Sequence, residues 1–211
     1  MFELPKDDGL VIRTVEQGTD AWHRLKAGIP SASRFGEILT STGDKSKQAE
    51  KYAKYLACGR VLGLNPSGHT SDAMIHGIET EAEARKAYEV KAGVVVEEVG
   101  LVYKDEDRNV LCSPDGLIDD DGGLEIKCPM ATTHAEYLMN GVLPTKYKLQ
   151  VQGSLWVTGR KYWDFMSYCK GFRSLVVRVT PDRKIFNALN RVMPEFNEMV
   201  DDMYNRIKEE G

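Results

Sequence analysis

The sequence predicts a mixed α/β domain in which helices flank a central β-sheet. Two groups of short segments rich in Val, Ile and aromatic residues have the composition of strands. Segments with helical periodicity precede the first group, separate the two groups, and follow the second as a long amphipathic pattern. This order lacks the regular strand–helix alternation of a doubly wound fold, so we expect a mixed sheet.

The first third of the chain is expected to be mainly helical. A helix at 31–39 would begin with Ser31 as its N-cap, because a serine hydroxyl can accept from a free backbone N–H. The stretches 40–48 and 63–72 are small, polar and Gly-containing, which is typical of loops. The expected helices are 19–27, 31–39, 48–62 and 71–91.

The rest of the chain alternates between strand and helix signals. The segments 110–118 and 123–128 flank the sequence DDDGG, which is typical of a hairpin loop. Regularly spaced apolar residues near the C-terminus indicate an amphipathic helix that is kinked or broken near Pro194. The expected elements are strands at 93–105, 110–118 and 123–128, helices at 129–140 and 144–157, strands at 161–169 and 174–180, and a helix at 185–207.

The composition favours a single domain over residues 1–211. The hydrophobic share of 42% and the charged share of 28% are ordinary for a soluble globular protein. No apolar run could span a membrane and no secretory signal peptide is visible, so we expect a cytoplasmic protein. The four cysteines lack C-x-x-C spacing, which argues against a zinc site or a disulfide framework. The net charge of −4 means that a polyanionic partner would need a local basic region or metal ions.

The predicted hairpin carries the candidate chemistry. Pairing around a loop centred on Asp120 places Asp115 opposite Glu125, with Cβ atoms about 4.5–5.5 Å apart. Because side chains alternate along a strand, Glu125 and Lys127 share a face and Ile126 points away. Two opposed carboxylates repel each other, and a divalent cation such as Mg²⁺ removes that repulsion. A nearby lysine can position or deprotonate a water molecule, so the arrangement suits metal-assisted phosphodiester hydrolysis.

A purely structural interpretation stays open from spacing alone. The sequence SPDG at 113–116 is typical of a type I turn, and LEIK at 124–127 fits a half-exposed strand with a solvated charged face. Aromatic residues further along could stack on bases, although core packing is the expected role. These residues are Trp156, Tyr162, Trp163 and Phe165.

Longer motifs resemble those of one nuclease family. An acid followed at a short distance by Glu-x-Lys is the PD-(D/E)xK nuclease signature, present here as Asp115 and residues 125–127. In order along the chain, VEQGTDAWHRLKAGIPSAS, CSPDGLIDDDGGLEIKCP, LQVQGSLWVTGRKYW and VMPEF resemble the phage lambda exonuclease and YqaJ-type viral recombinase family. The resemblance runs from about residue 15 to residue 203 and is weakest across 40–73.

The resemblance implies a restriction-endonuclease-like fold and a Mg²⁺-dependent exonuclease, with Mn²⁺ as an alternative and one or two ions per site. Such an enzyme degrades one strand of linear double-stranded DNA in the 5′→3′ direction, releases mononucleotides and leaves a 3′ single strand. The resemblance also implies a homotrimeric ring, binding to DNA ends, a single-strand annealing protein as partner, and a phage or prophage protein in a bacterial host.

The resemblance assigns roles to the motif residues. Asp115 and Glu125 would bind the metal, the main-chain carbonyl of Ile126 would be a further ligand, and Lys127 would assist the attacking water.

Two helical residues join them by resemblance. Glu81, in HGIETEAEAR, matches an upstream acid that serves the metal site, and Gln150, in QVQ, matches a glutamine beside the active site. Without the family, both would be interpreted as solvated helix residues.

The resemblance also implies a pocket for the terminal 5′-phosphate of DNA, formed by Lys26, Ser33 and Ser113. A cation with hydroxyl donors suits a phosphate group. The lambda pattern has arginine where this chain has Lys26, and lysine lacks the bidentate fork of arginine. Met74 matches an apolar position that acts as a wedge at the duplex end, although a Met at helical spacing is more often part of the core.

Two other classes of function remain open. A sequence-specific endonuclease with the same core would cut covalently closed DNA at its site, whereas an exonuclease needs an end. A non-catalytic DNA-end clamp would not require the catalytic residues of the motif. The presence of Asp115, Glu125 and Lys127 therefore argues against it.

Overall fold

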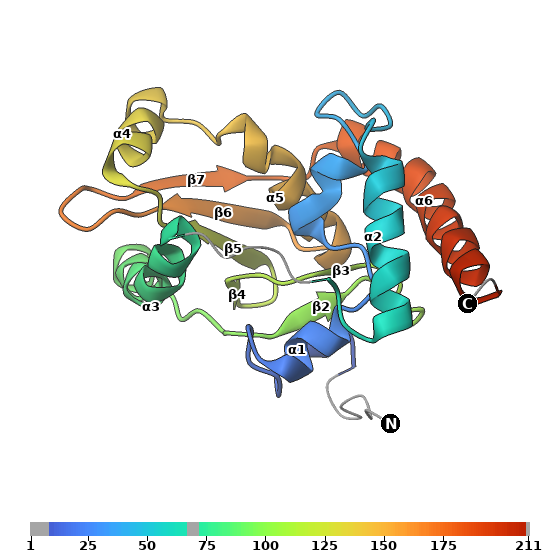
Figure 1. Cartoon of the computed structure of the whole chain (residues 1–211). Helices are drawn as coiled ribbons and strands as arrows, with labels where there is room; N and C mark the ends of the chain where they lie inside the picture. The colour runs from blue at the N-terminus through green and yellow to red at the C-terminus, as the bar shows by residue number, and fades with distance from the viewer. Residues whose placement is uncertain (1–8, 67–71, 210–211) are drawn as a thin grey trace.

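The fold is built around a four-stranded mixed sheet with strand order β4-β5-β6-β7 (Figure 1). A computed structural model of the chain describes residues 9–66 and 72–209, without the side chains of 72–78. The outer pairs β4–β5 and β6–β7 are antiparallel, while β5 and β6 are parallel. The strands are β4 Gly116–Ile118, β5 Gly122–Lys127, β6 Tyr162–Ser167 and β7 Leu175–Val179.

A smaller antiparallel sheet has the order β1-β2-β3. Its strands are β1 Val11–Ile12, β2 Leu101–Tyr103 and β3 Leu111–Cys112. An isolated bridge between Glu97 and Leu117 connects the segment before β2 to β4. The two sheets therefore meet close to the predicted hairpin.

Two strand predictions are partly wrong. The expected strand at 110–118 is divided, because β3 pairs with β2 and β4 pairs with β5, and Pro114 between them has no N–H to donate to a ladder. Within 93–105 only β2 forms a strand. The N–H of Val96 donates to the Glu89 carboxylate (2.9 Å) instead of to a neighbouring strand.

The predicted helices form, and the second of them is a 3₁₀-helix. Its N-cap is Ser31 as expected, but the Ser31 hydroxyl makes no capping hydrogen bond. None of the described helices is long and apolar enough to cross a membrane. The helices are α1 Asp20–Leu25, the 3₁₀-helix Ala32–Glu37, α2 Ala49–Leu62, α3 Asp72–Ala92, α4 Ala131–Asn140, α5 Thr145–Thr158 and α6 Arg183–Glu209.

The C-terminal helix α6 continues through Pro194, so of the predicted kink or break at this proline the break is wrong. A proline inside a helix costs about 3 kcal/mol relative to alanine. Here the apolar stripe is buried on both sides of the proline, by Val192 and Met193 before it and Phe196 after it. This stripe packs against α2, which lies beside α6 (Figure 1), and the packing offsets the cost of the proline.

The alternation of side chains along β5 creates two different environments. Leu124 and Ile126 are buried in a cluster with Ala84 and Tyr88 of α3. Gly123, Glu125 and Lys127 fall on the opposite face, which α5 covers. The aromatic residues Trp156, Trp163 and Phe165 are buried in the cluster on that face, so the prediction of core packing is confirmed for them.

Candidate active site

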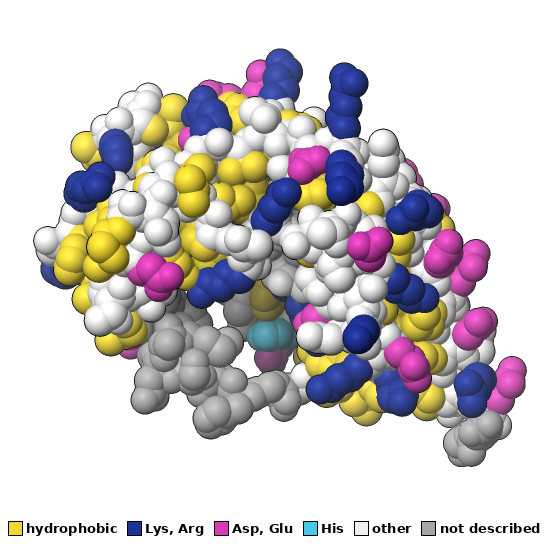
Figure 2. Space-filling model, turned by 90° about the horizontal axis from the view of Figure 1, so that it is seen from above, with side chains coloured by type: hydrophobic (Ala, Val, Ile, Leu, Met, Phe, Trp, Pro, Cys, Tyr) yellow, Lys and Arg dark blue, Asp and Glu magenta, His cyan; other side chains and the backbone are white. Residues whose placement is uncertain are grey.

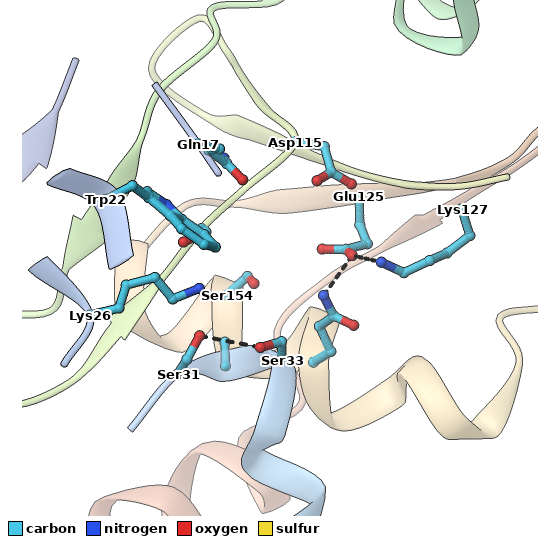
Figure 3. A pocket seen from close by; sticks show the side chains of 12 residues that line it. Gln17, Trp22, Lys26, Ser31, Ser33, Asp115, Glu125, Lys127 and Ser154 are labelled. Carbon is cyan, nitrogen blue, oxygen red and sulfur yellow. Dashed lines mark hydrogen bonds and ion pairs between the residues drawn. The ribbon is translucent and has the colours of Figure 1, made fainter. Parts of the chain in front are cut away.

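A cleft of about 150 Å³ lies where β5, α5 and the N-terminal segment meet (Figure 3). Asp115, Glu125 and Lys127 lie at one end of the cleft, and Trp22 and Lys26 lie at the other. The cleft brings together most of the residues that the sequence singles out, which are Lys26, Ser33, Ser113, Asp115, Glu125, Lys127 and Gln150.

The hairpin register explains why the motif residues meet. Gly116 pairs with Leu124, which confirms the predicted register and sets Asp115 beside Glu125. The Asp115 N–H donates to the Leu124 carbonyl (3.2 Å), and the Ile126 N–H donates to Asp115 Oδ2 (2.6 Å). These two bonds fix the Asp115 carboxylate against the end of β5.

Glu125 is a buried carboxylate with only one oxygen satisfied by protein donors. Its side chain is 2% exposed, and its Oε1 accepts from Lys127 Nζ and from Gln150 Nε2, each at 2.5 Å. Its Oε2 is buried without a hydrogen-bond partner among the described residues. Burial raises the pKa of the Glu125 carboxyl to about 7, against the opposing charge of Lys127. Burial by itself would lower the pKa of Lys127, but the Glu125 and Asp115 carboxylates raise it above its usual value.

Glu81 lies outside the cleft lining but close enough to influence it. Burial, followed by the nearby charge of Asp115, raises the pKa of the Glu81 carboxyl. Glu81 Oε1 accepts from Arg85 Nη2 (2.6 Å), one turn further along α3. The same guanidinium donates to the Asp115 carbonyl (3.0 Å) and pairs with Glu98 (2.7 Å). Arg85 therefore ties α3 to the backbone of the motif.

The donor set fits a divalent cation. Glu125 Oε2 is an unpartnered buried carboxylate oxygen, and the carboxylate of Asp115 lies beside it. No group of three or more His, Cys, Asp or Glu side chains suited to a metal ion occurs among the described residues. Mg²⁺ commonly uses one or two carboxylates and completes its shell with water and substrate phosphate, so two acids are sufficient.

The far end of the cleft combines a cation with hydroxyl groups. Lys26 Nζ lies 3.7 Å from the centre of the Trp22 ring, and burial lowers the Lys26 pKa to about 8. Ser33 lines the same space, and its hydroxyl lies 3.3 Å from that of Ser31. The Ser113 hydroxyl is buried without a hydrogen-bond partner among the described residues. An unsatisfied hydroxyl in the same cleft as a partly desolvated ammonium suits an anionic group.

Two predicted residues stand apart from this arrangement. The side chain of Met74 lies outside the described residues. The side chain of Ile126 packs under α3, so its main chain alone faces the motif, as the alternation along β5 requires.

Gln17, Trp22 and Arg85 were missed as individual site residues. Gln17 Nε2 donates to the carbonyls of Val99 (2.9 Å) and Pro114 (2.8 Å), which holds the segment that leads into Asp115. Gln17 and Trp22 fall within VEQGTDAWHRLKAGIPSAS, the first of the motifs that resemble the family. Arg85 stands four residues after Glu81, a spacing typical of helical ion pairs.

Comparisons with known proteins agree with the fold. Residues 21–161 match the model of the YqaJ-like viral recombinase domain. No curated protein matches the chain. The structure of an alkaline exonuclease from Laribacter hongkongensis is similar over 92% of this chain and 100% of that one, at 28% identity and a TM-score of 0.77. A complex of that exonuclease with dAMP gives 29% identity and a TM-score of 0.76, over 90% of this chain and 95% of that one.

A phage-related exonuclease from Haemophilus somnus 129PT shares the fold. The match covers 86% of this chain and 96% of that one, at 14% identity and a TM-score of 0.63. The restriction-endonuclease-like fold that the sequence predicted is confirmed by these similarities.

We expect Arg85→Met to lower the free energy of unfolding by about 1.5–3 kcal/mol, the usual worth of hydrogen bonds to charged groups. The substitution removes the shared donor of Glu81, Glu98 and the Asp115 carbonyl. Chemical denaturation measures the change. The control Lys86→Met, on the same helix, removes a 3.5 Å pair of an exposed lysine and should change stability by less than about 1 kcal/mol. Equal effects of the two substitutions would contradict a structural role for Arg85.

Proposed function

The chain belongs to the YqaJ-like viral recombinase family, and we propose that it is a metal-dependent exonuclease that degrades linear double-stranded DNA in the 5′→3′ direction. Its family and its structural neighbours support a nuclease with a role in recombination. The observation that carries the proposal is the buried Glu125, which has one oxygen bound by Lys127 and Gln150 and the other without a partner among the described residues, beside Asp115.

Asp115, Glu125 and the main-chain carbonyl of Ile126 would hold Mg²⁺ or Mn²⁺, with one or two ions per site. Glu81 on α3 would also serve this metal site. The bound cation supplies a more acidic water and offsets charge on the phosphate. Glu125 would use its free Oε2 for this task, since Oε1 is already bound by protein donors.

Lys127 and Gln150 act from the chain itself. Because the pKa of Lys127 is raised, its ammonium stays charged and can donate to the attacking water or to a phosphate oxygen. Gln150 donates to Glu125 Oε1, which fixes the rotamer of the carboxylate and leaves Oε2 directed elsewhere. The two donors thus orient Glu125 and leave it one free oxygen for the metal.

Lys26, Ser33 and Ser113 would bind the terminal 5′-phosphate of the digested strand. Their position in the same cleft as the carboxylates supports cleavage one nucleotide from the end, with release of mononucleotides. Lys and Arg side chains are spread over the face shown in Figure 2, with Asp and Glu side chains among them. Lys and Arg side chains on this face can contact a polyanion such as DNA, although the net charge of the chain is −4.

The wider proposal rests on the family. It comprises a single domain of residues 1–211, a homotrimeric ring around DNA, transfer of the 3′ single strand to a single-strand annealing protein, and a cytoplasmic location in a bacterial host.

We expect Lys127→Ala to lower the rate of digestion by about 10²–10³-fold, the usual worth of one preorganised hydrogen-bond donor, while DNA binding persists. Steady-state digestion and a binding assay on the same duplex measure the two effects. Lys146→Ala is the matched control, because Lys146 lies on α5 near Tyr147 and does not line the cleft. Undiminished digestion by Lys127→Ala would rule out its role.

The reaction class is tested by comparing linear duplex, with and without a 5′-phosphate, against covalently closed circular DNA in Mg²⁺ or chelator. In Mg²⁺ we expect digestion of the linear duplex alone, with release of mononucleotides. In chelator we expect no digestion of either DNA. Cutting of the closed circle would favour the endonuclease alternative. Binding to ends without hydrolysis of any linear duplex would favour the non-catalytic clamp.

The preference for a 5′-phosphate should decline as the pH rises through about 8. Below that pKa Lys26 is charged and binds phosphate, whereas above it the amine is neutral. The ratio of kcat/KM for phosphorylated and unphosphorylated ends, measured from about pH 7 to pH 9.5, should fall by up to tenfold per unit above the pKa. Lys26→Arg should keep its preference over this range, because a guanidinium does not titrate there. The same decline in both proteins would assign the effect to another group.

A further inference from the structure

A second cavity adjoins the catalytic cleft on the far side of Lys26. Its volume is about 430 Å³, within the range of roughly 300–1,000 Å³ that is usual for small-molecule sites. It lies among α1, the 3₁₀-helix, α2 and the residues that follow α2. Both spaces are lined by Trp22, Lys26, Ser31 and Ser33, so they meet at these four residues. The space that would hold a terminal phosphate therefore continues beyond the phosphate.

The walls of the second cavity have the chemistry of a nucleotide site. The Arg34 guanidinium lies 4.1 Å from the centre of the Tyr52 ring and 4.2 Å from that of Tyr55. Glu37 accepts from Arg34 Nε (2.6 Å) and Nη2 (2.9 Å), which holds the guanidinium beside the rings. The Arg34 side chain is still 34% exposed. Aromatic rings and guanidinium planes are the surfaces on which unpaired bases stack, and they do so with little regard to base identity.

The wall next to Lys26 is fixed before any ligand binds. Asn65 donates to the Lys26 carbonyl (3.0 Å) and accepts from the Gly28 N–H (2.8 Å). Arg60 Nε donates to the Gly28 carbonyl (3.0 Å). Gly28 has a φ of +68°, and a Cβ there would overlap the Arg60 side chain. A preformed wall lowers the ordering cost of binding.

We propose that this second cavity is a subsite for a nucleotide joined to the 5′ side of the terminal position, so that the enzyme accepts an end that reaches one nucleotide past Lys26. A phosphodiester, unlike a terminal phosphate, needs space on both sides of Lys26 and Ser33, and the two adjoining spaces supply it. The extending base would stack against Tyr55 and Arg34. This inference rests on the proposed exonuclease function.

The subsite predicts a second product. When the strand is shifted by one nucleotide, water attacks the phosphorus of the second linkage and the bond to the 3′ oxygen breaks. The shortened strand then keeps a 5′-phosphate, and a dinucleotide with a 3′-hydroxyl is released. No further reactant is required.

The test uses a 5′-phosphorylated duplex whose first linkage is a phosphorothioate, which keeps its charge and resists cleavage. We expect the wild-type enzyme to release the intact dinucleotide from this end and mononucleotides from an unmodified end. Tyr55→Ala should lower dinucleotide release by about 5–150-fold, the worth of one stacked base, with mononucleotide release from unmodified ends retained.

Leu64→Trp is a second variant that does not depend on removing a packed ring. Leu64 lines the cavity and is 46% exposed, so a larger side chain should fill the space and leave the core intact. It should suppress dinucleotide release in the same selective way. Tyr204→Ala on α6 is the matched control, because Tyr204 is outside both spaces.

Three outcomes would overturn the inference. The blocked end could stop the enzyme while unmodified ends are digested, or both cavity variants could retain the wild-type ratio of products. Alternatively, Leu64→Trp could relieve inhibition by added deoxynucleoside monophosphate without affecting dinucleotide release, which would assign the cavity to the released product. Failure to digest even the unmodified end would contradict the proposed function instead, so the two failures are distinguishable.

Discussion

The rest of the site depends on the burial of one carboxylate, that of Glu125. A carboxylate removed from water costs several kcal/mol unless charge and hydrogen bonds replace its hydration. Lys127 and Gln150 supply that replacement for Oε1 alone. Oε2 is buried without a protein donor among the described atoms, beside a second acid, Asp115. The site is thus stable enough to form but remains short of positive charge, which is the condition in which a cation binds.

The β5 strand makes this arrangement possible because its two faces meet different helices. One face places Leu124 and Ile126 against α3 and anchors the strand, while the other presents Glu125 and Lys127 to Gln150 of α5. Arg85 then joins the two sides, since it binds Glu81 on its own helix and the carbonyl of Asp115 on the hairpin. Glu125 lies within β5 and Glu81 within α3, while Asp115 directly precedes β4 and is held by backbone hydrogen bonds to β5. Acids placed on or fixed against such elements keep their geometry.

The sequence predicted individual elements better than their partners. Each helix and the hairpin register followed from local periodicity and turn chemistry, and both are confirmed. The expected strand at 110–118 was wrong as a single element, because nothing local shows that β3 and β4 join different sheets. The expected break at Pro194 was wrong for a similar reason, since burial of Val192 and Phe196 against distant residues outweighs a local preference.

By itself the sequence determined that Asp115, Glu125 and Lys127 converge, because they are close in the chain and strand alternation fixes their faces. Only the tertiary structure decided which oxygen of Glu125 is free, that Arg85 joins Glu81 to Asp115, and that a second cavity opens beyond Lys26. These features depend on contacts between residues far apart in the chain. Local sequence patterns do not predict such contacts, because burial and long-range hydrogen bonds arise only when the layers pack.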